Sequence, residues 1–207
     1  EAKPCQTVAI SGSTGSGISR LAKLLPRFFD VTNGKITLDG VDIRDISIET
    51  LRSQIGYVPQ TGILFSGDIN SNISYGAPGI DEAGIKEAAQ IAQATEFIED
   101  KPDKFESAIA QGGTNVSGGQ KQRLSIARAI ARNPKIYIFD DSFSALDFKT
   151  DTQLRKALKP KTKDATVFIV AQRVSTILHA DQILVLDEGK LVGKGTHKQL
   201  VKTCETY

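Results

Sequence analysis

Three glycines separate a short apolar run from an amphipathic stretch near the start of the chain. The run Thr7 to Ser11 is apolar and β-branched, and the letters GSTGSG after it contain Gly12, Gly15 and Gly17. A glycine loop between a strand and a helix lets backbone N–H groups wrap a phosphate at the positive end of the helix dipole. The spacing therefore predicts a phosphate-binding turn.

This segment fits the phosphate-loop pattern GxxxxGK[ST] except at the lysine. It reads Gly12-Ser13-Thr14-Gly15-Ser16-Gly17-Ile18-Ser19, so the loop and the hydroxyl that would ligate Mg²⁺ are kept. A hydrogen bond to a charged group contributes about 1.5–3 kcal/mol, so having Ile18 in place of lysine should weaken nucleotide binding by about ten- to a hundredfold. Arg20 is not expected to substitute, because residues two apart on a helix face different sides.

Two other groups of residues point to the same chemistry. In IYIFDD, Asp140 ends a buried type of strand, where its carboxylate can hold Mg²⁺ through water beside Ser19. Asp141 follows in the position of a general base that polarises water. Further back, Ser117-Gly118-Gly119-Gln120 opens a helix, and its two glycines leave N–H groups accessible to a phosphate that arrives from outside.

Taken together, these motifs resemble the ATP-binding cassette (ABC) family. The segment VSGGQKQRLSIARAI matches the family signature with only its first residue, usually Leu, replaced by Val116, and the resemblance covers essentially all 207 residues in order. It implies the nucleotide-binding domain of a membrane exporter, with ATP and Mg²⁺ as cofactors. It also implies a head-to-tail dimer in which the Walker motifs of one cassette and the signature of the other enclose each ATP.

The resemblance assigns a role to each matching position. The residues that would contact nucleotide are Gly12, Ser13, Thr14, Gly15, Ser16, Gly17, Ile18, Ser19, Arg20, Ser117, Gly118, Gly119, Gln120 and the D-loop residue Asp147. Metal binding would fall to Ser19, Asp140 and Gln60, the last being the Q-loop residue that senses the metal and the membrane domain. Catalysis would involve Gln60, Asp141 and Gln172.

Three departures from the family fall on one nucleotide site. Ile18 replaces the Walker lysine, Asp141 stands where the family has Glu, and Gln172 stands where it has the switch His. Asp is one methylene shorter than Glu, which moves the base away from water, and Gln cannot carry charge. The Asp141 and Gln172 pair resembles the degenerate subunit of heterodimeric bacterial multidrug exporters. The resemblance therefore implies little or no hydrolysis at the chain's own Walker site and a second cassette as partner, in a heterodimer or a homodimer.

The elements that must position these residues are predicted from hydrophobic periodicity. A helix is expected over Ile18 to Phe29, a hairpin around Asp39-Gly40 and a helical insertion at roughly 61–132. Strands are expected at Thr7 to Ser11, Ile55 to Val58, Ile136 to Phe139, Thr166 to Val170, Gln182 to Leu186 and Lys190 to Gly193. The predicted fold is α/β, a P-loop NTPase (RecA-like) with a parallel sheet core, a small antiparallel β region and an inserted helical subdomain.

This fold is expected to form one nucleotide-binding domain over residues 1–207. Relative to the family it is truncated at its N-terminus, where members have about two more strands and an aromatic residue that stacks on adenine. Tyr57, Tyr75, His179 and His197 are expected to be packing, cap or surface residues without a catalytic role.

Composition excludes several other classes of protein. The chain has 26 Lys and Arg against 24 Asp and Glu and no run of like charge, which argues against a nucleic-acid partner. Only Cys5 and Cys204 are present, in no CxxC pair, which argues against disulfides or a zinc site. No apolar stretch approaches the roughly eighteen residues of a membrane helix, so the chain is expected to bind a transmembrane domain at the cytoplasmic face of the cell membrane without spanning it.

Three functions remain to be compared. The first is an exporter motor domain paired with an ATPase-competent partner. The second is a regulatory or structural cassette that does not bind ATP productively, which leaves open whether the chain is itself an enzyme. The third is a soluble ABC-type ATPase of DNA repair or translation, which the sequence disfavours because it has neither a coiled-coil insert nor a second cassette.

Overall fold

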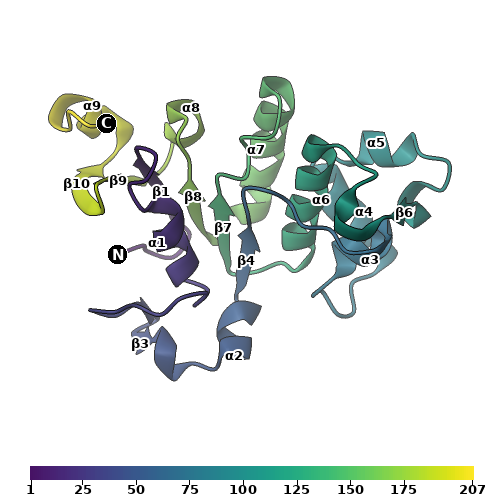
Figure 1. Cartoon of the computed structure of the whole chain (residues 1–207), viewed down its shortest axis with the longest axis horizontal. Helices are drawn as coiled ribbons and strands as arrows, with labels where there is room; N and C mark the ends of the chain where they lie inside the picture. Colours follow the sequence, from purple (N-terminus) through teal and green to yellow (C-terminus); the bar gives the residue numbers. More distant parts are fainter. The chain divides into compact units, whose positions relative to one another are not determined.

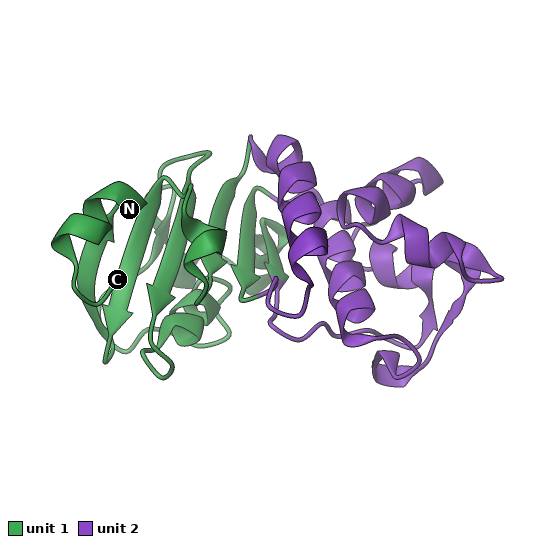
Figure 2. Cartoon of the chain, turned by 90° about the horizontal axis from the view of Figure 1, so that it is seen from above, with its two compact units in different colours: residues 1–57, 135–141, 164–207 green, residues 58–134, 142–163 purple.

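The computed structural model describes all residues from 1 to 207, and the chain divides into two compact units (Figure 2). Unit 1 contains residues 1–57, 135–141 and 164–207. Unit 2 contains residues 58–134 and 142–163. The helical insertion expected at 61–132 falls within unit 2.

Unit 1 is built on a six-stranded sheet in the order β10-β9-β1-β8-β7-β4 (Figure 1). Its strands are β1 (Thr7–Gly12), β4 (Ile55–Val58), β7 (Ile136–Asp140), β8 (Thr166–Val170), β9 (Gln182–Asp187) and β10 (Lys190–Gly195). β1 is parallel to β8 and β9, β7 is parallel to β8, and β10 is antiparallel to β9. The apolar, β-branched runs suit strands buried on both faces, and the predicted parallel sheet is confirmed.

The register of the sheet determines which loops lie together. Val170 at the end of β8 is opposite Ile10 of β1 on one side and Asp140 of β7 on the other. In a parallel sheet the carboxyl ends of all strands lie at the same edge, where ligands bind. The glycine turn after β1 and the carboxylate that ends β7 are therefore brought to one edge of unit 1.

A tight hairpin forms the small antiparallel region of unit 1. β2 (Thr37–Leu38) pairs with β3 (Val41–Asp42) across a turn in which Asp39 and Gly40 have φ of 51° and 81°. Positive φ at both central residues is what a type I′ hairpin requires, and Asp-Gly is a preferred pair there. The hairpin predicted from the sequence is confirmed.

The helices of unit 1 are short. They are α1 (Ile18–Leu24), α2 (Ile48–Ser53), α8 (Val174–Ile177), α9 (His197–Thr203) and the 3₁₀ turn η1 (Ile43–Asp45). The predicted helix over Ile18 to Phe29 is too long, since α1 ends at Leu24 and Arg27 has a φ of 57°. The helix ends in a Schellman motif, in which the N–H of Arg27 donates to the carbonyl of Leu24 and the N–H of Phe28 donates to that of Lys23.

A hydrophobic cluster connects α1 to the sheet. Ile18 and Ala22 of α1 are buried with Ile10, Ile138 and Leu186 of the strands. Residues of the same cluster also line a cavity of about 730 Å³ between the hairpin and the sheet. Its walls include Leu25, Ile36, Leu38, Leu51, Ile55 and Phe168, and none of the predicted site residues lines it.

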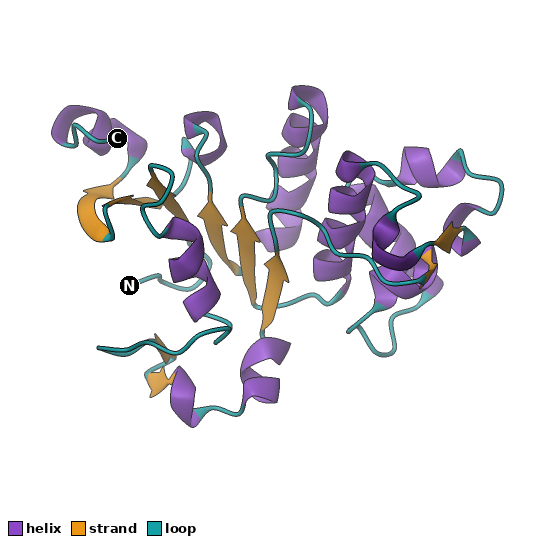
Figure 3. Ribbon diagram, in the orientation of Figure 1, coloured by secondary structure: helices purple, strands orange, loops and turns teal.

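Unit 2 is mostly helical (Figure 3). Its elements are β5 (Gly67–Asp68), α3 (Ile69–Ser74), α4 (Glu82–Ile91), α5 (Thr95–Glu99), η2 (Lys104–Glu106), β6 (Ala108–Ile109), η3 (Gln111–Gly113), α6 (Gly118–Ala131) and α7 (Phe148–Thr162). The helices α3 and α4 pack against α6, and β5 pairs with β6 in an antiparallel ladder. None of the helices in either unit combines the length and the apolar character needed to cross a bilayer.

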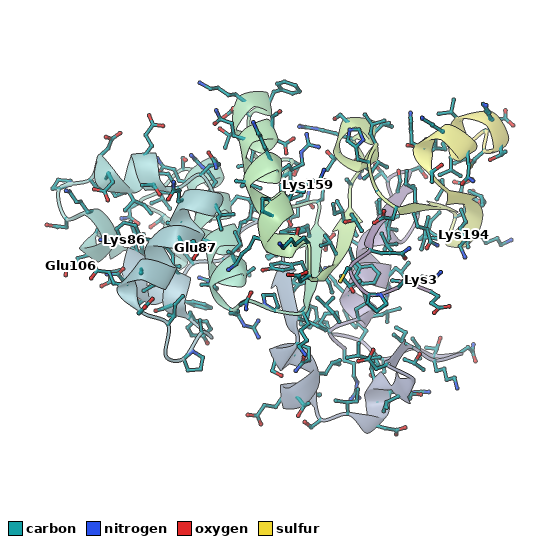
Figure 4. All side chains as sticks on the ribbon, turned by 180° about the vertical axis from the view of Figure 1, so that it is seen from behind. Lys3, Lys86, Glu87, Glu106, Lys159 and Lys194 are labelled. Carbon is teal, nitrogen blue, oxygen red and sulfur yellow. The ribbon has the colours of Figure 1, made fainter.

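Charged side chains cover the outer surface of α4. Lys86 and Glu87 project from this helix (Figure 4), where Lys86 pairs with Glu82 at 2.9 Å and Glu87 with Lys161 of α7 at 3.8 Å. Exposed pairs of this kind contribute little to stability, typically about 0–1 kcal/mol. The apolar packing on α6 therefore holds unit 2 together.

Candidate nucleotide-binding site

The glycine turn of unit 1 lies between β1 and α1, as the sequence predicts. Gly15 and Gly17 have φ of 83° and 92°, a backbone conformation that glycine adopts without steric cost. A hydrogen bond from the N–H of Ser16 to the carbonyl of Ser13 closes the turn at 3.0 Å. Gly17 is the residue before α1, and no side chain caps the helix there.

Ser16 is the buried centre of this turn. It is 2% exposed, and its Oγ has no hydrogen-bond partner. A side chain at Gly12 would run into that hydroxyl, and its Cβ would lie 2.5 Å from the carbonyl oxygen of Leu186. Burying a hydroxyl without a hydrogen-bond partner costs free energy, whereas an anion within the turn would accept a hydrogen bond from it. The turn thus fits a phosphate group.

Ser19 and Asp140, two of the predicted metal ligands, lie in direct contact. The hydroxyl of Ser19 donates to Oδ1 of Asp140 at 2.9 Å, and Asp140 is 3% exposed at the end of β7. Hydroxyl and carboxylate oxygens are ligands that Mg²⁺ accepts, usually one or two from the protein with phosphates and water completing the shell. This donor pair fits the Mg²⁺ that the sequence predicts.

Tyr57 also contacts Asp140, a role that sequence reasoning missed. Its hydroxyl donates to Oδ2 of Asp140 at 2.7 Å, although the sequence suggested only a packing role. Burial, followed by the hydrogen bond to Asp140, raises the pKa of Tyr57 well above its usual value. The signal that could have found this contact is the sheet order, since β4 and β7 are neighbours, but that order cannot be read from Tyr57 alone.

Two side chains that follow the turn contact other residues of unit 1. Ile18 is 6% exposed and belongs to the hydrophobic cluster beneath α1. Arg20 is exposed, and its guanidinium lies over the ring of Phe29 at 5.4 Å. The position of the family lysine is therefore filled by a core residue, and Arg20 binds an aromatic ring.

Asp141 and Gln172 follow the ends of neighbouring strands. Asp141 has a φ of 52°, and its N–H donates to the carbonyl of Val170 at 2.8 Å. Gln172 is exposed two residues after the end of β8. The sheet of unit 1 thus carries both residues at the edge where Ser19 and Asp140 lie.

The signature residues open α6 in unit 2. Ser117 Oγ accepts from the N–H of Gln120 at 3.1 Å, and the Gln120 side chain accepts from the N–H of Ser117 at 3.1 Å, a complete capping box. A side chain at Gly118 would meet nothing within 4 Å, and one at Gly119 would approach only the carbonyl of Ala145, at 3.6 Å. The helix start is therefore both stable and open.

The D-loop residue Asp147 caps α7. Its carboxylate accepts from the N–H and the hydroxyl of Thr150, each at 2.8 Å. The backbone hydrogen bond from Thr150, then its hydroxyl, lowers the pKa of Asp147 below the usual range. Asp147 is therefore ionised at neutral pH.

Gln60 lies on an exposed loop of unit 2 whose root is held by buried hydrogen bonds. Ser142 Oγ donates to the carbonyl of Val58 at 2.7 Å, and Gln122 Nε2 of α6 donates to the carbonyl of Pro59 at 2.9 Å. The predicted metal ligands are thus divided, because Ser19 and Asp140 belong to unit 1 and Gln60 belongs to unit 2.

Comparisons with known proteins agree with these motifs. The family model described as ABC transporter matches residues 1–144. An uncharacterised ABC transporter ATP-binding protein of Mycobacterium tuberculosis is 47% identical over 209 residues, which cover 100% of this chain and 36% of that protein. A Bacillus subtilis protein with the provisional name multidrug export ATP-binding/permease protein is 45% identical over 196 residues, 95% of this chain and 34% of that protein.

A solved structure of a bacterial Atm1-family ABC exporter with ATP bound has the same fold. It matches with a TM-score of 0.95 and 38% identity, over 98% of this chain and 36% of that chain. The predicted α/β P-loop fold is confirmed. The chain spans about a third of the length of these relatives, so they contain much that this sequence does not.

Proposed function

The chain belongs to the ABC transporter family, and from that premise we propose that it is the nucleotide-binding domain of an ABC exporter that couples ATP to transport. The observation that carries this proposal is the 2.9 Å hydrogen bond between Ser19 and Asp140 beside a glycine turn. It brings two oxygen ligands for Mg²⁺ to the turn that would hold the phosphates. When bound, Mg²⁺ would neutralise phosphate charge.

The chain's own Walker site would bind ATP weakly and hydrolyse it slowly. Ile18 supports this, because its side chain is part of the core and offers no charge to a phosphate. Asp141 and Gln172 add to the effect, since Asp141 is shorter than the family's Glu and Gln172 cannot carry charge as the family's His can. The open signature turn of unit 2 would complete a working site on a second cassette in a head-to-tail dimer, which we propose to be a heterodimer.

An exposed apolar surface of unit 2 supports a membrane-domain partner. Ile63, Phe65 and Tyr75 are 58%, 45% and 60% exposed, and the rings of Phe65 and Tyr75 are 4.9 Å apart. Arg128 of α6 lies over both rings and donates to the carbonyl of Ile63 at 2.7 Å. Large exposed apolar residues gathered on one rigid surface are typical of interaction sites. We propose that they dock a transmembrane domain at the cytoplasmic face of the membrane.

A non-catalytic cassette is the second candidate, and the burial of Ile18 favours it. In that case the chain would not retain ATP at its own turn and would act only through the signature. The two candidates share the same assembly and differ in nucleotide affinity.

Calorimetric titration of Mg-ATP into the native chain, Ile18→Lys and Ile18→Met separates these candidates. The lysine should raise affinity by about ten- to a hundredfold, and methionine, unbranched but uncharged, should not. Measurable binding by the native chain supports a weak but occupied site. Binding by Ile18→Lys alone supports the non-catalytic cassette, and no binding by any of the three would contradict a nucleotide site at this turn.

A further inference from the structure

The carboxylate of Asp140 is held by two hydroxyl groups, one on each oxygen. Ser19 donates to Oδ1 at 2.9 Å and Tyr57 donates to Oδ2 at 2.7 Å. A buried carboxylate needs such donors, and hydrogen bonds of this kind fix its orientation. Ser19 is also a predicted metal ligand, so its hydroxyl would either donate to Asp140 or ligate the metal, whereas the Tyr57 hydroxyl only donates to Asp140.

The ring of Tyr57 is braced by an aromatic and cationic stack. Phe28 packs edge-on against it, with ring centroids 5.1 Å apart and planes at 89°. Arg52 lies over Phe28 at 5.3 Å and is itself fixed by hydrogen bonds to the carbonyls of Pro26 at 3.0 Å and Arg27 at 3.1 Å. The contact with Phe28 and the hydrogen bond to Asp140 together restrict the Tyr57 side chain, so its hydroxyl stays directed at Asp140.

We propose that Tyr57 is a positioning residue for the metal site. Its hydroxyl keeps one oxygen of Asp140 directed toward Ser19 when the Ser19 hydroxyl turns from Asp140 to ligate Mg²⁺. The inference rests on the proposed nucleotide site and deepens it. Without Tyr57, Asp140 would lose its remaining donor as the metal enters and would rotate freely. Hydrogen-bond partners of metal ligands typically change metal affinity by about ten- to a hundredfold when removed.

The test uses Tyr57→Phe, which keeps the ring on Phe28 and removes only the hydroxyl. The matched control is Tyr137→Phe in β7, because Tyr137 is a buried tyrosine of the same sheet whose hydroxyl has no partner. Mn²⁺ replaces Mg²⁺ in a titration at saturating ATP, followed by electron paramagnetic resonance, with the native chain and Ile18→Lys as parents. ATP affinity in EDTA and the melting temperature are measured alongside.

Tyr57→Phe should need about tenfold more Mn²⁺ than its parent, while its metal-free ATP affinity and melting temperature stay within error. Tyr137→Phe should match the parent in Mn²⁺ affinity, metal-free ATP affinity and melting temperature. Unchanged Mn²⁺ affinity in Tyr57→Phe overturns the inference, as does an equal loss of metal-free ATP affinity, which would indicate a general structural role. If neither parent binds Mn-ATP, the proposed nucleotide site fails and this inference with it, whereas a binding parent with an unaffected Tyr57→Phe overturns this inference alone.

Discussion

The two glycine turns of this chain differ in how many of their hydrogen-bonding groups are satisfied without a ligand. In unit 1, the turn from Gly12 to Ser19 is tightly packed, encloses an unpartnered hydroxyl at Ser16 and leads into a helix that no side chain caps. In unit 2, a capping box satisfies the N–H groups of Ser117 and Gln120, and Gly118 between them stands in open space. The first turn is shaped to enclose an anion, which would complete its hydrogen bonds. The second turn is already stabilised by its own hydrogen bonds and leaves an open surface that an anion on another molecule could reach.

The departures from the family pattern follow the same division. Ile18, Asp141 and Gln172 all belong to unit 1, whereas the signature in unit 2 departs from the family only at Val116. A chain that had lost all function would be expected to change in both places. The difference supports the proposal that this cassette contributes more to a partner's nucleotide site than to its own.

The largest effect is expected from a charge placed on the open turn. In Gly118→Asp, a carboxylate would face the incoming phosphate, and two like charges about 4 Å apart repel by about 4 kcal/mol at an effective dielectric of 20. ATP hydrolysis by the assembled transporter should fall by at least about a hundredfold. Folding should be unaffected, because nothing lies within 4 Å of the new Cβ and an acidic residue suits the first turn of a helix.

Gly118→Asn is the matched control, since it has the same size without the charge. It should retain most of the activity that Gly118→Asp loses. Equal losses in the two variants would mean that bulk rather than charge is excluded, and normal activity in both would contradict the role of this turn in a partner's site.

A smaller effect is expected from filling the closed turn. In Gly12→Ala, the added methyl would run into the Ser16 hydroxyl and lie 2.5 Å from the carbonyl of Leu186, which belongs to the sheet backbone and cannot move freely. Overpacking of this kind should lower the free energy of unfolding by about 2–3 kcal/mol, measured in urea. Gly118→Ala, by contrast, should be neutral or slightly stabilising. Equal stability of the two variants would remove the distinction between a packed and an open turn.

Much of this arrangement could be predicted from the sequence because local patterns determine it. The parallel strands follow from apolar runs of the right length, the hairpin follows from Asp39-Gly40, and the start of α6 follows from the capping letters of Ser117 and Gln120. The pairing of Ser19 with Asp140 could be anticipated because both residues follow strands of one parallel sheet.

The parts that were missed depend on contacts between segments far apart in the chain. Tyr57 is 83 residues from Asp140 in the sequence. The pattern of apolar residues in the strand that contains Tyr57 indicates only a half-buried position. The hydrogen bonds from Gln122 and Ser142 that hold the root of the Gln60 loop also join distant segments, 63 and 84 residues apart in the sequence. The early end of α1 differs from the prediction because the apolar spacing continues to Phe28, whereas Arg27 adopts a φ of 57° and closes the helix before it.

The smallest effect is expected at Asp141, and a large effect there would contradict the proposed difference between the two turns. Asp141 has a φ of 52°, and Asn tolerates this left-handed conformation as well as Asp does, so Asp141→Asn should keep the fold and the N–H bond to Val170. A working general base contributes about 10²–10⁴-fold to a rate, but hydrolysis by the assembled transporter should change by less than about twofold if a partner's site does the chemistry. A loss of a hundredfold with normal ATP affinity would identify Asp141 as the base, and the unit 1 site would then be the catalytic one.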